Sequence, residues 1–237
     1  MKKLRLMATA WTVGIIGGVI FTVLRIFGRI KIKGALPKQP RDSGLLIISN
    51  HPSLWEAGTF PFLLFPRYLW NWRAVPFSTP DKENFYDKWW FVLFRPVCVP
   101  VPRGDRKAEI QALQKMISTV QEKGTLILFA EGGRTYKGGE FKESKISKKR
   151  IRPFQNGAGA IARRAKPMII PIWTEGGDKI LPNRSCGSEF YWALPRLWKR
   201  MDVIIGQPLA APDNLKTDEL IDWLEDKLLD LADTIRG

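Results

Sequence analysis

The sequence predicts an α/β fold: a mixed, mostly parallel sheet flanked by helices, preceded by an N-terminal hydrophobic membrane-anchor helical segment. Three observations predict it. Short apolar runs typical of buried strands alternate with stretches of helical periodicity. Apolar residues make up 45% of the 237 residues, which is enough to bury one core. Residues 6–24 carry no charge at all. We therefore divide the chain into an anchor, residues 1–33, and one α/β domain, residues 34–237.

The anchor segment comes first along the chain. As a helix, residues 6–24 would measure about 28 Å, close to the hydrocarbon thickness of a bilayer. Cations flank both ends, so the positive-inside rule assigns no orientation. These symmetric flanks, with Gly17-Gly18 at the centre, favour an anchor lying in one leaflet over a full span. A signal peptide is disfavoured because Arg25 follows the apolar run directly, and a soluble core helix because the run is long and flanked by cations.

The strands of the domain are expected where short apolar runs occur. Residues 45–49 (LLIIS), 125–130 (TLILFA) and 168–173 (MIIPIW) predict buried strands, and 203–205 a further short one. The run 97–101 is interrupted by proline, which predicts an edge strand or an irregular extended segment.

The helices are expected between these strands. Residues 108–123 have apolar side chains at helical spacing and end before Gly124, a favourable C-cap. Residues 157–165 predict a second helix. Thr217 begins the last helix, with acidic residues in its first turn that complement the helix dipole.

Charge and rare residues limit the possible functions. Lys and Arg number 38 against 23 Asp and Glu, giving a net charge of +15. This excess predicts an anionic partner, whether nucleic acid, a lipid surface or a phosphorylated ligand. The two cysteines do not make a disulfide framework, which favours a reducing compartment. His51 is the only histidine, which excludes a site built from several histidines, and we expect neither a metal nor a cofactor.

The first polar cluster follows the strand 45–49. Ligands of α/β sheets gather beyond the carboxyl ends of strands, and His51 and Glu56 stand there. If the chain turns between them, the carboxylate accepts a hydrogen bond from one ring nitrogen and leaves the other free as a base. A substrate hydroxyl would then supply the nucleophile. The same spacing alone also fits a structural histidine near a surface glutamate.

The second polar cluster, Glu131–Thr135 (EGGRT), follows the strand 125–130. Its two glycines let the backbone approach a ligand, and Arg134 can hold a phosphate with a bidentate fork. Arg103 is a second phosphate candidate. Taken separately, both arginines also fit ordinary surface positions. If the two strands are parallel neighbours, the two clusters lie together.

In this order, the motifs resemble those of the glycerolipid acyltransferase family, of the lysophosphatidic acid acyltransferase type. That family has an N-H-x4-D block, an apolar segment ending in arginine, F-x-E-G-x-R-[ST], and an apolar strand containing proline. The matching residues are Asn50–Glu56, Val99–Arg103, Phe129–Thr135 and Ile169–Ile172. The resemblance covers about residues 34–210. Glu56 replaces the usual aspartate, and Gly133 stands where threonine is usual.

The resemblance implies transfer of a fatty acyl group from an acyl-CoA or acyl carrier protein thioester to the free hydroxyl of lysophosphatidic acid, in phospholipid biosynthesis. His51 would be the general base and Glu56 would orient it. Arg103 and Arg134 would hold the acceptor phosphate, and Glu131 would shape the acceptor loop. The implied substrate-binding residues are Arg103, Glu131, Gly132, Gly133, Arg134 and Thr135.

The implied partners are a phospholipid bilayer, the thioester donor and a lysophospholipid acceptor, at the cytoplasmic face of the inner membrane. Residues 142–152 hold six cations and predict a surface loop. This loop meets headgroups, CoA phosphates or an acidic carrier, or is simply solvated.

Two alternative functions stay open. One is another lyso-lipid or a lipid A-type acceptor. The other is a basic, membrane-tethered protein without catalysis; nucleic acid is not expected as a partner, because the cations are not interleaved with aromatic residues.

Overall fold

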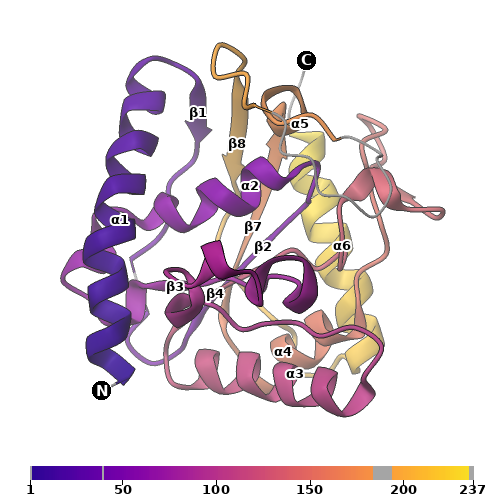
Figure 1. Ribbon diagram of the computed structural model, residues 1–237. Coiled ribbons are helices and arrows are strands. Elements are labelled where there is room, and N and C mark those ends of the chain that lie inside the picture. Colours follow the sequence, from indigo (N-terminus) through magenta and orange to yellow (C-terminus); the bar gives the residue numbers. More distant parts are fainter. Residues whose placement is uncertain (1, 39, 184–193, 235–237) are drawn as a thin grey trace.

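The computed structural model describes residues 2–38, 40–183 and 194–234. It is a three-layer structure with a central sheet between two helical layers (Figure 1). The sheet has the strand order β1-β8-β7-β2-β4-β3, and β9 pairs with β7 beside β8. A separate two-stranded sheet joins β5 and β6. The strands are β1 (Ile30–Lys33), β2 (Leu45–Ser49), β3 (Pro76–Phe77), β4 (Thr125–Leu128), β5 (Lys142–Glu143), β6 (Arg150–Ile151), β7 (Met168–Glu175), β8 (Met201–Ile205) and β9 (Leu209–Ala210).

The pairing confirms the predicted mixed, mostly parallel sheet. β2 lies between β4 and β7 and is parallel to both, and β3 and β4 are also parallel. β8 and β9 run antiparallel to β7, while β1 runs parallel to β8. The run 97–101 makes only isolated bridges to residues 78 and 81, as its proline predicts.

The longer helices occur where the periodicity predicts them, and α2 and α5 are short helices that it did not predict. The α-helices are α1 (Lys2–Ile26), α2 (Leu54–Thr59), α3 (Arg106–Gln121), α4 (Asn156–Ala165), α5 (Gly177–Ile180) and α6 (Thr217–Asp233). α3 begins two residues before its predicted start because the Asp105 carboxylate caps it, accepting hydrogen bonds from the Lys107 and Ala108 N–H groups. Short one-turn helices fill the connection between β2 and α3: η1 (Phe60–Leu64), η2 (Arg67–Leu69), η3 (Trp72–Ala74), η4 (Lys82–Tyr86), η5 (Trp89–Phe91) and η6 (Arg95–Val97); η7 (Thr135–Lys137) follows β4.

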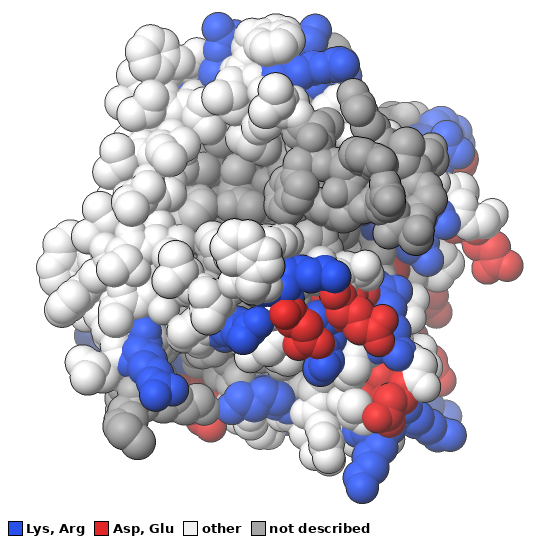
Figure 2. Space-filling model, viewed as in Figure 1, with Lys and Arg blue, Asp and Glu red and all other residues white. Residues whose placement is uncertain are grey.

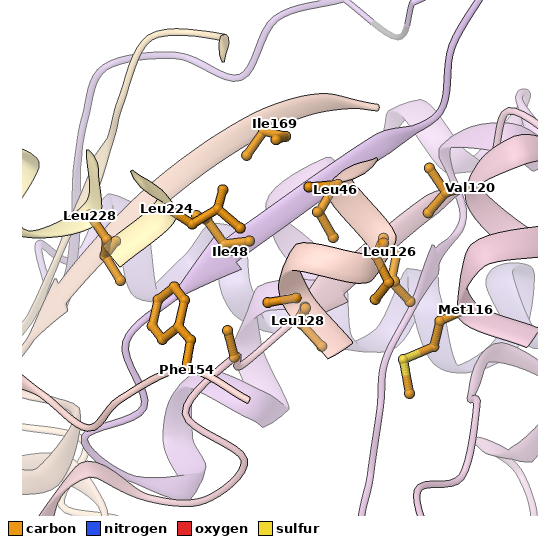
Figure 3. Packing of buried hydrophobic residues seen from close by; sticks show 14 of the residues in the cluster. Leu46, Ile48, Met116, Val120, Leu126, Leu128, Phe154, Ile169, Leu224 and Leu228 are labelled. Atoms are coloured by element: carbon orange, nitrogen blue, oxygen red, sulfur yellow. The ribbon is translucent and has the colours of Figure 1, made fainter. Parts of the chain in front are cut away.

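Alternating residues of the central strands build a core on each face of the sheet. Leu46 and Ile48 of β2 pack among α3, α4 and α6, as Figure 3 shows from close by. Leu45 and Ile47 point to the opposite face, toward α1 and residues 60–75. All four side chains are buried, as expected for a strand covered on both faces. The central strand is thereby fixed in register, and the residues that follow it start from a rigid position.

The N-terminal helix α1 is fastened along the domain. The Trp11 indole Nε1–H donates to the Leu69 carbonyl oxygen at 2.8 Å, and the Tyr68 hydroxyl donates to that of Gly14 at 2.7 Å. Gly17 leaves room for the Phe62 ring, whose nearest atom lies 2.0 Å from where a Cβ would stand. Residues 30–33, within the expected anchor segment, form β1 of the sheet. The anchor segment and the domain therefore share one packed structure.

The other side of α1 is apolar and open. Within the described residues, one helical segment, Leu4–Ile26, is long and apolar enough to cross a membrane. Figure 2 shows mostly uncharged side chains on the left of the molecule, where α1 lies. We call the exposed apolar side chains of this helix and its neighbours the apolar face: Leu4, Trp11, Ile15, Ile16, Val19, Ile20, Val23, Ile26, Phe27, Trp70, Val92, Leu93 and Phe94.

Candidate active site

The two polar clusters meet at the carboxyl ends of β2 and β4. These strands are adjacent and parallel, so the residues after each emerge at the same edge of the sheet. The Thr135 N–H donates to the His51 carbonyl oxygen at 2.9 Å, which joins the two clusters directly. The sequence therefore correctly predicts that these segments, eighty positions apart, lie together.

Glu131 joins the two clusters through its carboxylate. It is fully buried, and its Oε1 accepts hydrogen bonds from the His51 N–H and from the Thr135 hydroxyl, both at 2.8 Å. Its Oε2 accepts the Arg152 N–H at 2.9 Å. Burial raises the pKa of Glu131, and these hydrogen bonds oppose that rise. A carboxylate bound at both oxygens is well placed to shape the loop and poorly placed to exchange protons.

Asn50 fixes the end of β2 against β7. Its side-chain amide donates to the Thr174 carbonyl oxygen at 2.9 Å, and its Oδ1 accepts the Thr174 N–H at 2.9 Å. This reciprocal pair extends the β2–β7 ladder by one side chain. The residue before His51 therefore has a structural role in placing it.

His51 is buried against an aromatic ring. Its imidazole stacks on Phe129, with ring centroids 4.4 Å apart. The pKa of His51 is lowered to about 3, first by burial and then by the Arg134 charge, while the Ser53 backbone opposes the shift. Its Nδ1 is buried and has no hydrogen-bond partner among the described residues. The imidazole is therefore uncharged at neutral pH, and one ring nitrogen is free to accept a proton, as a base requires.

Glu56 differs from the expected geometry, because it does not hydrogen-bond to His51. Its Oε2 accepts the Ser53 N–H at 2.9 Å and lies 3.1 Å from the Ser53 Oγ. Ser53 and Glu56 form a capping box at the start of α2, which draws the carboxyl group toward the helix terminus. Burial raises the pKa of Glu56 to about 8, so the group is protonated at neutral pH. The spacing Ser-x-x-Glu was visible in the sequence and predicts this capping contact.

Gly177 is a residue of the site that sequence reasoning missed. A Cβ on Gly177 would lie 1.5 Å from the Glu56 Oε1 and 3.2 Å from the Ser53 Oγ. Only glycine leaves room for the glutamate side chain there. The signal in the sequence is the Gly176-Gly177 pair, which begins three positions after the end of the predicted strand 168–173.

Of the two predicted phosphate-binding arginines, Arg134 belongs to the EGGRT loop and Arg103 contacts that loop. Arg134 donates from Nη1 to the Asn183 Oδ1 at 3.1 Å, and Asn183 in turn donates to the Pro52 carbonyl oxygen at 2.6 Å. This places Arg134 beside the segment that carries His51. Arg103 donates from Nε to the Asp81 carboxylate at 2.6 Å and from Nη2 to the Gly132 carbonyl oxygen at 2.6 Å. Arg103 therefore holds the loop with two of its groups.

The glycines of the loop admit neighbouring side chains. Gly132 has φ +66, a conformation that other residues rarely adopt, and a Cβ there would lie 2.7 Å from the Gln155 Cγ. A Cβ on Gly133 would lie 2.7 Å from the Arg152 Nη1. Arg152, from the predicted basic run 142–152, thus reaches the site, which sequence reasoning did not anticipate. Within the described ranges, no group of three or more His, Cys, Asp or Glu side chains could hold a metal ion.

Comparison with known sequences gives one family match and two relatives. The sequence profile of the family described as Acyltransferase matches residues 29–175. The chain is 27% identical over 217 residues to tafazzin of Drosophila melanogaster, covering 85% of this chain and 50% of that protein. It is 29% identical over 161 residues to the chloroplastic 1-acyl-sn-glycerol-3-phosphate acyltransferase BAT2 of Brassica napus, covering 68% of this chain and 41% of that protein. It thus spans about half the length of these relatives or less.

A solved structure shares the fold. The crystal structure of PlsC, the 1-acyl-sn-glycerophosphate acyltransferase of Thermotoga maritima, superposes with a TM-score of 0.59 at 18% identity. The match covers 93% of this chain and 78% of PlsC. At this identity the likeness establishes the architecture, in which a mostly parallel sheet follows an apolar N-terminal helix.

Proposed function

The chain belongs to the acyltransferase family, and from this premise we propose that it transfers a fatty acyl group from an acyl-CoA or acyl carrier protein thioester to the free hydroxyl of lysophosphatidic acid. The observation that carries this proposal is the convergence of His51 with the EGGRT loop, joined through the Glu131 carboxylate. It puts a buried base beside an arginine suited to a phosphate. The resemblance of one relative, named a 1-acyl-sn-glycerol-3-phosphate acyltransferase, supports the acceptor.

The proposed reaction needs no covalent enzyme intermediate. The acceptor hydroxyl gives its proton to a ring nitrogen of His51 as its oxygen attacks the thioester carbonyl carbon. The carbon–sulfur bond then breaks, and the leaving thiolate takes the proton back from the imidazolium. The donor thiolate leaves readily, so the enzyme contributes positioning and proton transfer.

Arg134 links acceptor binding to the base. After burial, its positive charge is the second cause that lowers the pKa of His51. An acceptor phosphate bound to Arg134 offsets that charge and brings the imidazole closer to the range that favours proton transfer near neutral pH. Glu56 contributes through Ser53, by fixing the turn between His51 and α2.

A second candidate acceptor is another lyso-lipid. It is favoured by the similarity to tafazzin, whose name does not specify lysophosphatidic acid. The deciding experiment incubates the purified chain in detergent with labelled acyl-CoA or acyl carrier protein and a panel of lyso-acceptors. Transfer to lysophosphatidic acid above the other acceptors supports the first proposal. Preference for a lyso-lipid without a phosphate monoester supports the second, and no transfer to any acceptor contradicts both.

Replacing Arg134 tests the phosphate contact. We expect Arg134→Ala to raise the KM for lysophosphatidic acid by about ten- to a hundredfold, since a charge-assisted hydrogen bond is lost. The KM for the thioester donor should stay close to its original value. Steady-state kinetics with each substrate varied in turn measure both. An unchanged acceptor KM would contradict the assignment of Arg134 to the phosphate.

We also propose that the apolar face inserts into one leaflet of a bilayer, at the cytoplasmic face of the inner membrane, where CoA and carrier thioesters are available. Ile16 and Ile20 of this face are more than half exposed. We expect Ile16→Lys combined with Ile20→Lys to weaken liposome binding more than tenfold, since each buried isoleucine contributes about 1.5–3 kcal/mol. Co-sedimentation with liposomes measures the loss.

Two lysines placed elsewhere provide the control for this membrane test. Gln111 and Gln114 are exposed on α3, in the opposite helical layer, and their replacement by lysine adds the same charge. We expect that variant to bind liposomes as the original protein does. Turnover in detergent micelles should persist in both variants. Equal liposome binding by both variants would exclude α1 as the membrane contact.

A further inference from the structure

Arg152 reaches into the loop that carries the predicted phosphate-binding residues. Its backbone N–H donates to Glu131, whose other carboxylate oxygen binds His51, so the three residues belong to one hydrogen-bonded unit. Its side chain then runs along two glycines of the loop. A Cβ on Gly138 would lie 2.6 Å from the Arg152 Cγ, and one on Gly133 would lie 2.7 Å from its Nη1. The guanidinium therefore lies directly beside the residue that precedes Arg134.

The Arg152 guanidinium makes no ion pair within the described part of the chain, although its charge acts at longer range on the buried Glu131 carboxylate and lowers the pKa of Glu131. Three of the other cations in the same basic run have partners. Lys142 pairs with Glu225 at 3.1 Å, Lys149 pairs with Glu175, and Arg150 lies over the Phe141 ring, with Cζ 5.0 Å from its centroid. The Arg152 guanidinium is partly buried and has neither an ion pair nor a hydrogen bond to a described residue. Its guanidinium N–H groups are therefore available to hydrogen-bond an anion that binds at this position.

We propose that Arg152 is a further acceptor-binding residue, whose guanidinium binds the acceptor's phosphate monoester across Gly133 and together with Arg134. The inference rests on the proposed acyl transfer and specifies how that site selects its acceptor. A doubly charged phosphate monoester satisfies two guanidinium groups, whereas a neutral glycerolipid satisfies neither. Arg152 thus favours phosphate-bearing acceptors over those without a phosphate.

Gly133 is the position that admits this side chain. Any larger residue would place its Cβ against the Arg152 Nη1, and the guanidinium would have to shift. Because Gly133 has no side chain, the Arg152 guanidinium has room to contact the phosphate as a second binding group. The two residues act as a pair, which a double-mutant comparison can detect.

The first measurement uses the full chain in detergent and the Kd of lysophosphatidic acid, which does not depend on turnover. We expect Arg152→Ala to raise this Kd, and the KM in the acyl-transfer assay, by about ten- to a hundredfold. Arg152→Lys should give a smaller rise, since lysine keeps the charge and loses the fork. The ratio of kcat/KM for lysophosphatidic acid to kcat/KM for a monoacylglycerol, which has no phosphate, should fall in both variants and fall most in Arg152→Ala.

Gly133→Ala and Arg150→Ala complete the test. Gly133→Ala should raise the Kd for lysophosphatidic acid in the original protein and add nothing further in the Arg152→Ala background. Arg150→Ala removes the same type of side chain from the same hairpin, and we expect it to leave the Kd unchanged. A rise with Arg150→Ala equal to that with Arg152→Ala would overturn the inference, because the effect would be general electrostatics.

The outcomes separate this inference from the proposed reaction. An unchanged Kd in Arg152→Ala overturns the inference, whether or not the protein catalyses acyl transfer. Lysophosphatidic acid binding that depends on Arg152, in a protein that transfers no acyl group, supports the inference and overturns the reaction. A folded Arg152→Ala variant is verified by its circular dichroism and thermal unfolding before either comparison.

Discussion

Acyl transfer is expected to fall by about a hundred- to ten-thousandfold in His51→Ala, the range that a positioned general base contributes. The chain has a single histidine, so no other imidazole can take over. The fold should persist, because neighbouring elements are held by other residues: Asn50 binds β7, and Glu131 binds Thr135 and Arg152. Initial rates with labelled donor, together with circular dichroism, measure the two effects separately.

His51→Gln is the matched control for this prediction. Glutamine is polar, of similar size, and cannot act as a base at neutral pH. We expect it to be as inactive as His51→Ala, while binding lysophosphatidic acid with nearly the original Kd. Turnover retained in either variant would contradict the mechanism, since another group would then be removing the proton.

The pH dependence follows from the shifted pKa of His51. Its pKa is lowered to about 3 in the folded chain, against about 6.5 in the unfolded chain. Between these values the unfolded state binds a proton that the folded state does not, so His51 destabilises the fold progressively as pH falls from about 6.5 toward 3. His51→Ala removes this contribution and should show a smaller loss of stability over that interval. An equal loss in both proteins would show that the imidazole is not desolvated.

The second large effect is expected at Gly177. Gly177→Ala would place a methyl group 1.5 Å from the Glu56 Oε1 and 2.7 Å from its Cδ, and Glu56 is fully buried. Overpacking of this kind costs about 1–3 kcal/mol. It also breaks the contact between Glu56 and Ser53 that fixes the turn after His51. We expect strongly reduced turnover and a lower melting temperature.

Glu56→Asp supplies the compensating change. Aspartate is one methylene shorter, so its carboxyl group is withdrawn from the position that the new methyl group occupies. The double variant Glu56→Asp with Gly177→Ala should be more stable and more active than Gly177→Ala alone. Gly58→Ala is the control: it lies in α2, and a Cβ there would meet nothing within 4 Å, so little effect is expected. If the double variant shows the sum of both single losses, the two residues are not coupled.

The fold was predictable because its central strands and longer helices have clear patterns of apolar residues. The run LLIIS is apolar on both alternating sets of residues, and β2 is indeed covered on both faces. The helices α3 and α6 follow the apolar spacing to within two residues. The many one-turn helices between β2 and α3 were not predicted, because segments of three to five residues have no periodicity to detect.

The sequence predicted which segments come together at the site better than it predicted the partners of individual side chains. Parallel pairing of β2 with β4 follows from the alternation of strands and helices, and it brings His51 and Glu131 together. The partner of Glu56 was predicted incorrectly, because a helix N-terminus three residues away competes with an imidazole for the carboxyl group. Gly177 and Arg152 were missed because their roles depend on space left by a glycine, which a pattern of residue types does not reveal.

The attachment of α1 to the domain has a consequence for how the protein would search for substrate. Hydrogen bonds from Trp11 to Leu69 and from Tyr68 to Gly14 hold this helix against the rest of the chain. For a chain held in a leaflet by its apolar face, the height of His51 above the lipid is then constant. A lipid acceptor would arrive by lateral diffusion in two dimensions at one fixed depth, while the thioester donor arrives from water in three. Acceptors would therefore be selected by the depth of their free hydroxyl in the leaflet, before any residue of the site contacts them.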